Sequence, residues 1–176
     1  MVAAAVRGFE EADMACCLKH FPGLGSAEGD SHTARISIPD DLEGLKASEL
    51  KPFQAGIAAG APLVMMGHLS VPAVTGNDVP ASLSEAMVTG VLRDQLGFDG
   101  VVITDSLGMQ AVTDYYSSAE AVVAAVQAGC DVMLMPEDLQ AAYDGLLGAV
   151  QDGAISEGRI DGSLRRILAV KQRYLP

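Results

Sequence analysis

The chain has 176 residues, 49% of them apolar and 19% charged, and its formal net charge is −12. This length and composition are typical of a globular domain, so we expect a single domain over residues 1–176. The acidic balance argues against nucleic acid and membrane surfaces as partners, because both are bound through clustered Lys and Arg. No apolar run approaches the roughly 18 residues of a membrane span. The first residues lack the basic start of a signal peptide, and we expect a cytoplasmic location.

Short apolar runs alternate with helical patterns along the chain. A helical pattern over residues 2–13 comes first, and the apolar runs follow at residues 15–18, 63–66, 101–104 and 132–135. Apolar runs without alternation are typical of strands that are buried on both faces. Between and after them, helical patterns cover residues 48–59, 82–96, 117–128, 139–150 and 164–174. Repeated β/α units of this kind predict an α/β fold with a parallel sheet and right-handed crossovers.

Local signals refine this prediction. Capping boxes that begin at Ser82 and Ser117 predict two of the helix starts. Three cysteines, Cys16, Cys17 and Cys130, do not suggest a disulfide framework, and we expect three small buried hydrophobic side chains.

Chemistry-bearing residues are expected where the strands end, because parallel β/α folds place their sites at the carboxyl edge of the sheet. Asp105 follows the third apolar run directly and is the best single candidate. A carboxylate there could act as a nucleophile or as an electrostatic stabiliser. The alternative is that Asp105 caps the turn that follows it.

Histidines and a lysine follow the other runs. Asp30 lies two residues before His32, and a carboxylate near an imidazole makes an acid/base pair; the alternative is a solvated loop histidine. Lys19 and His20 follow the first run and could bind the hydroxyl groups of a polar substrate, although Lys19 could instead form a structural salt bridge. His68 follows the second run, where a histidine is often a structural hydrogen-bonding group.

No cofactor and no metal site is expected. His20, His32, His68 and Asp105 lack the local spacing of metal ligands. The pair Gly23 and Gly25 lacks the third glycine and the helix start of a nucleotide-binding loop.

Three segments together resemble glycoside hydrolase family 3. They are Lys-His-Phe-Pro-Gly-x-Gly at residues 19–25, Asp-Ser-His at residues 30–32, and Gly-Val-Val-Ile-Thr-Asp-Ser-Leu-x-Met at residues 100–109. The Asp-Ser-His element is similar to the β-N-acetylhexosaminidase branch of that family. The resemblance extends from about residue 2 to residue 174.

The resemblance implies a retaining glycosidase that removes terminal β-linked N-acetylhexosamine. By that resemblance, Asp105 would be the nucleophile and His32, oriented by Asp30, the acid/base. Lys19 and His20, with His68 beside them, would be the substrate-binding residues. A β-glucosidase-like activity, a phosphate acceptor in place of water, and a non-catalytic assembly partner are the alternatives.

The resemblance covers only strands five to eight of an eight-stranded (β/α) barrel, which needs about 250 residues. A half-barrel exposes sheet edges and half of a core. We therefore expect a part of a longer product, or association with another copy or a complementing half-barrel. We also expect weak or absent activity from the chain alone.

Overall fold

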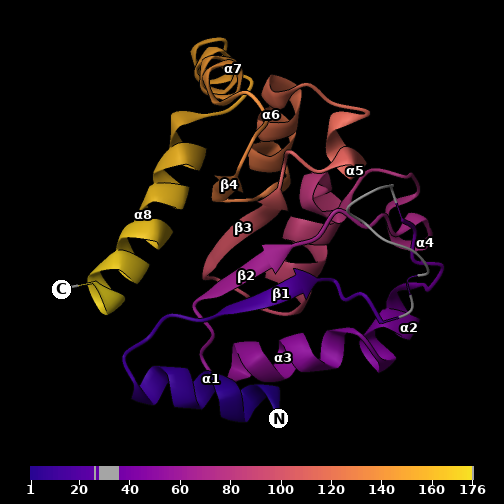
Figure 1. The fold of residues 1–176 in the computed structure, drawn as a ribbon, viewed down its shortest axis with the longest axis vertical. Helices are drawn as coiled ribbons and strands as arrows, with labels where there is room; N and C mark the ends of the chain where they lie inside the picture. Colours follow the sequence, from indigo (N-terminus) through magenta and orange to yellow (C-terminus); the bar gives the residue numbers. More distant parts are fainter. Residues whose placement is uncertain (26, 28–35, 176) are drawn as a thin grey trace.

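The computed structural model describes residues 1–25, 27 and 36–175. Its centre is a four-stranded parallel sheet in the order β1-β2-β3-β4 (Figure 1). The strands are β1 (Cys17–Phe21), β2 (Leu63–Met66), β3 (Val101–Ser106) and β4 (Val132–Leu134). Sequence order and spatial order are the same, as expected for successive β/α units, and the predicted α/β fold is confirmed.

Helices connect and flank the strands. They are α1 (Val2–Glu11), α2 (Leu42–Ala47), α3 (Leu50–Ala58), α4 (Pro72–Thr75), the 3₁₀ turn η1 (Ala81–Leu83), the π-helix η2 (Ala86–Gln95), α5 (Gln110–Thr113), α6 (Ser118–Ala128), α7 (Leu139–Gln151) and α8 (Glu157–Tyr174). Within the described ranges, no helix is long and apolar enough to cross a bilayer.

Helix starts follow the sequence signals in one case and depart from them in another. Ser117 and Glu120 form the predicted capping box of α6. The predicted box at Ser82 is wrong: Ser82 lies in η1, and η2 begins after Glu85 without a side-chain cap. The hydroxyl of Ser82 is instead 2.8 Å from His68. A tertiary hydrogen bond has replaced the local one.

The two faces of the sheet differ in burial. Val64 and Val102 are register partners on the face that packs against α3, η2 and α6, and both are fully buried. Met65 and Ile103 are register partners on the opposite face, and both remain partly exposed. The expectation of burial on both faces is therefore wrong for this chain, because no described element covers the second face. Three buried cysteines were also expected, but Cys17, at the start of β1, is exposed.

Two strands contain register shifts near their carboxyl ends. In β1, Leu18 pairs with Val64 but Phe21 pairs with Met66, so β1 has one extra residue between these pairs. In β3, a similar shift lies between Ile103 and Ser106. A bulge changes the direction in which neighbouring side chains point, and bulges are common next to active sites.

Candidate active site

The candidate site is centred on Asp105 and His20, at the carboxyl ends of β3 and β1. Oδ2 of Asp105 lies 3.6 Å from Nε2 of His20, and the two side chains are 22% and 25% exposed. The backbone N–H of Ser106 donates to Oδ1 of Asp105 at 2.8 Å. One carboxylate oxygen is thus held by the backbone, while the other faces a histidine and the surface.

The pair spans the intervening strand β2, and Gly67 makes that possible. Gly67 follows β2 directly, and its N–H donates to the carbonyl of Phe21 at 2.8 Å. A Cβ at Gly67 would lie 3.3 Å from Cβ of His20. That separation is tighter than an ordinary van der Waals contact, so a side chain at this position would force His20 to shift by a few tenths of an ångström.

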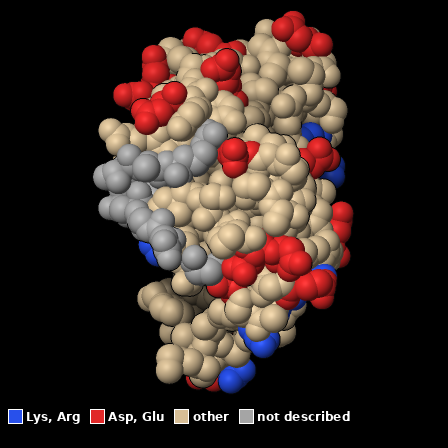
Figure 2. All heavy atoms as spheres, turned by 90° about the vertical axis from the view of Figure 1, so that its right-hand side faces the viewer, with Lys and Arg blue, Asp and Glu red and all other residues tan. Residues whose placement is uncertain are grey.

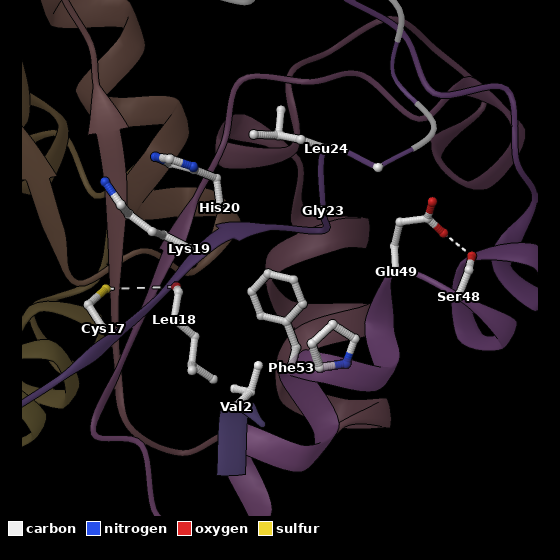
Figure 3. A pocket seen from close by; sticks show the side chains of 12 residues that line it. Val2, Cys17, Leu18, Lys19, His20, Gly23, Leu24, Ser48, Glu49 and Phe53 are labelled. Carbon is white, nitrogen blue, oxygen red and sulfur yellow. Dashed lines mark hydrogen bonds between the residues drawn. The ribbon is translucent and has the colours of Figure 1, made fainter. Parts of the chain in front are cut away.

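Lys19 and His20 lie within the register shift of β1, and their side chains extend toward the same side (Figure 3). Consecutive side chains of a regular strand point to opposite faces. Figure 3 instead shows Lys19 and His20 extending in one direction, while Leu18 and Val2 lie on the other side. Among the residues that the structure describes, Lys19 forms no ion pair.

A cavity of about 600 Å³ adjoins this site along β1 (Figure 3). Lys19 and His20 line it together with Glu49 and Phe53, but Asp105 does not. A Cβ on Gly23, whose φ is +124°, would lie 2.8 Å from Cβ of Glu49. The glycine after Phe-Pro therefore lets α3 approach the end of β1. Because the cavity lies beside Asp105 rather than over it, we place the candidate chemistry at Asp105 and His20.

His68 reaches the site only through other residues. Its ring is 1% exposed, with Nδ1 2.8 Å from the hydroxyl of Ser82 and Nε2 2.8 Å from the carbonyl of Ser106. A carbonyl only accepts, so Nε2 carries the proton, and Nδ1 accepts from Ser82. Burial lowers the pKa of His68, which keeps the imidazole neutral. His68 therefore fixes the backbone next to Asp105. This geometry fits a structural hydrogen-bonding group rather than a substrate-binding residue.

The structure thus brings three of the predicted site residues to one edge: Lys19, His20 and Asp105. Asp30 and His32 lie outside the described residues. Sequence reasoning missed Gly67 and Ser82. Gly67 could have been found from its position, because it lies between a predicted strand and His68. Ser82 could not, because its partner His68 is 14 residues away and no local pattern indicates the contact.

The charge of the molecular surface favours a neutral ligand. Figure 2 shows acidic side chains in several patches on one face, with basic groups only near its margins. With a net charge of −12, this surface would repel a polyanion.

A parallel sheet with a carboxylate at the end of an inner strand defines a β/α enzyme-type domain. Comparison with known proteins identifies which one. Residues 1–170 match the glycosyl hydrolase family 3 N terminal domain. The chain belongs to this family, as its sequence motifs predicted.

Individual relatives agree with the family. A beta-hexosaminidase of Stenotrophomonas maltophilia (strain R551-3) is 42% identical over 166 residues, which are 93% of this chain and 48% of that protein. A solved family 3 beta-N-acetylglucosaminidase from Paenibacillus sp. str. FPU-7 superposes with a TM-score of 0.94 at 47% identity, covering 98% of this chain and 33% of that one. The beta-glucoside phosphorylase BglX superposes with a TM-score of 0.91 at 26% identity, covering 98% of this chain and 32% of that one.

The chain spans about half the length of such curated relatives. Its sheet has four strands, and an eight-stranded barrel needs as many again. The described fold is therefore that of a half-barrel.

Proposed function

We propose that this chain carries the catalytic residues of a retaining glycosidase that acts on terminal β-linked N-acetylhexosamine. The observation that carries the proposal is the Asp105 carboxylate at the carboxyl end of β3. It has one oxygen held by the N–H of Ser106 and the other facing His20. A carboxylate held in this way is positioned for attack before the substrate arrives.

In the proposed reaction, a carboxylate oxygen of Asp105 attacks the anomeric carbon as the bond from that carbon to the leaving oxygen breaks. His32, oriented by Asp30, gives the leaving oxygen a proton. Water then attacks the anomeric carbon, His32 takes its proton, and Asp105 is released as the carboxylate. Lys19 and His20 hold sugar hydroxyls beside the reacting carbon.

The substrate assignment is supported by the beta-hexosaminidase and beta-N-acetylglucosaminidase relatives. The similarity to a beta-glucoside phosphorylase supports a second candidate, which uses glucosides and phosphate as the acceptor. Hydrolysis rates with 4-nitrophenyl N-acetyl-β-D-glucosaminide and 4-nitrophenyl β-D-glucoside, each with and without phosphate, separate the two. Faster turnover of the glucoside would overturn the first assignment.

The nucleophile is tested with Asp105→Asn. We expect the hydrolysis rate to fall by at least about a thousandfold, because the attacking oxygen is lost. Asp99→Asn is the matched control, since it removes the same charge from an exposed residue before the start of β3. A glycosyl adduct on Asp105, detected by mass spectrometry, would support the proposal. An adduct on another residue would overturn it.

We also infer that a second half-barrel covers the open face of the sheet. Met65 and Ile103 leave that face apolar and partly exposed, and β1 and β4 are edge strands among the described residues. In a solution of this chain alone, only a second copy can supply the missing half. Sedimentation should therefore show a dimer that Ile103→Glu dissociates. A monomer of the parent chain would contradict the inference.

A further inference from the structure

A buried carboxylate at the opposite end of the sheet is surrounded by three arginines. Asp131 directly precedes β4, and its side chain is fully buried. Its oxygens lie 2.8 Å from Arg93, 3.1 Å from Arg166 and 3.6 Å from Arg159. Ser163 also donates to it, at 2.6 Å. Three positive charges therefore face one negative charge in a protein that is otherwise strongly acidic.

The three arginines differ in how many hydrogen bonds their N–H groups donate. Arg93 donates to the carbonyls of Phe98, Gly100 and Gly129 as well as to Asp131. Arg159 donates to two carbonyls and to Ser163.

Arg166 is the exception. Within the described part of the chain it makes one hydrogen bond, from Nη1 to Asp131, and its side chain is 33% exposed. Most of its five donors therefore have no partner among the described residues.

A cavity of about 270 Å³ lies beside the three arginines, between η2 and α8. One turn of α8 contributes Gly158 and Gly162 to its wall. Within 4 Å, a Cβ on Gly162 would meet only Nη1 of Arg166, at 3.8 Å. The space that a side chain at Gly162 would occupy thus borders Nη1 of Arg166. The volume is several times the roughly 30 Å³ taken by one water molecule.

We propose that this cavity binds a phosphate group, with Arg166 as its main ligand and Arg93 and Arg159 supplying further positive charge. A guanidinium matches phosphate oxygens in a bidentate geometry. The two surplus positive charges equal the charge of a phosphate dianion. The pKa of Arg93 is lowered mainly by burial; Asp131 raises it, and the charges of Arg166 and Arg159 lower it further. A bound anion relieves the repulsion among these arginines.

The cavity lies at the amino-terminal ends of β3 and β4, whereas Asp105 and His20 lie at the carboxyl ends of their strands. It is therefore separate from the proposed catalytic site. A phosphate bound here would tie α8 to η2, since the cavity has residues of both helices in its wall.

Isothermal titration calorimetry of the 176-residue chain with inorganic phosphate tests the proposal. We expect saturable binding that persists when sodium chloride is adjusted to constant ionic strength, because general screening is then fixed. Arg166→Gln should weaken binding by at least about tenfold, the effect of one lost charged hydrogen bond. A parallel titration with glucose 6-phosphate, with glucose as its control, shows whether the phosphate group is bound free or as part of a sugar.

Two further variants keep the test decisive. Lys171→Gln removes the same charge from the exposed last turn of α8 and should leave the affinity unchanged. Gly162→Leu keeps every charge but fills the cavity, and it should abolish binding while circular dichroism remains that of the parent chain.

Absence of saturable phosphate binding by the parent chain would overturn the proposal. Equal losses in Arg166→Gln and Lys171→Gln, or unchanged binding in Gly162→Leu, would also overturn it. None of these measurements depends on glycosidase activity.

Discussion

Replacing His68 tests how the backbone beside Asp105 is held. His68→Gln keeps an N–H donor near the position of Nε2, so the carbonyl of Ser106 retains its partner while the hydroxyl of Ser82 loses its own. His68→Asn does the reverse, because its shorter side chain reaches only the position of Nδ1. His68→Leu removes both partners.

The magnitudes follow from burial. Ser82 is fully buried and the ring of His68 is 1% exposed, so neither lost hydrogen bond is replaced by water. A buried group without a partner costs about 1–3 kcal/mol. We expect the free energy of unfolding to fall by that amount in His68→Gln and in His68→Asn, and by about twice as much in His68→Leu. Urea denaturation followed by circular dichroism at pH 7.5 measures each loss.

The pH dependence gives an independent check. Burial lowers the pKa of His68 below its ordinary 6.5, so below about pH 6.5 the unfolded chain takes up a proton that the folded chain does not. The parent chain should therefore lose stability as pH falls from about 6.5 toward the folded pKa, by at most about 1.4 kcal/mol per pH unit from this residue. His68→Gln should lack this component, since glutamine does not titrate.

Two results would refute the reasoning. One is the same change in stability between pH 7 and pH 5 in the parent chain and in His68→Gln. The other is a nitrogen NMR spectrum that places the proton of His68 on Nδ1, because Nε2 could then not donate to Ser106. A double-mutant cycle with Ser82→Ala should show coupling only while residue 68 is histidine or asparagine.

Three further substitutions test stability, and urea denaturation measures the effect of each. Asp131→Asn should lower the free energy of unfolding by about 3–5 kcal/mol, because it leaves buried arginines without their counter-charge. A loss below about 1 kcal/mol would show that hydrogen bonds to carbonyl groups are enough to stabilise these arginines. Gly129→Ala should cost about 1–3 kcal/mol, since its φ is +121° and a Cβ would lie 2.7 Å from Oγ1 of Thr89. Gly148→Ala, in the middle of α7 with nothing within 4 Å of its Cβ, should instead stabilise the chain by about 0.5–1 kcal/mol. Equal effects of the two glycine substitutions would contradict this account.

Much of the fold could be predicted from the sequence because its signals are local. Apolar runs and helical periodicity predicted the four strands of the sheet and its parallel arrangement, and the capping box at Ser117 marked the start of α6. Strand ends were less predictable: the first run was expected to end at residue 18, but β1 continues to Phe21. Lys19 and His20 are polar, and only pairing with β2 makes them part of a strand.

The candidate site was predictable where position in a strand decides it. Asp105 directly follows one apolar run and His20 lies two residues after another, and parallel pairing brings both to one edge of the sheet. The Ser82–His68–Ser106 contacts and the arginines around Asp131 were not predictable. Their members are 14 to 38 residues apart, and neither spacing nor composition reports such pairs.

The bulge in β1 has a consequence for redesign. Lys19 and His20 lie in the stretch of β1 that holds one extra residue relative to β2. A combinatorial library at positions 19 and 20 could therefore change both side chains while the backbone of β1 keeps its register shift. Deleting one residue from this stretch would do the opposite, because a one-residue shift turns every later side chain of the strand to the other face.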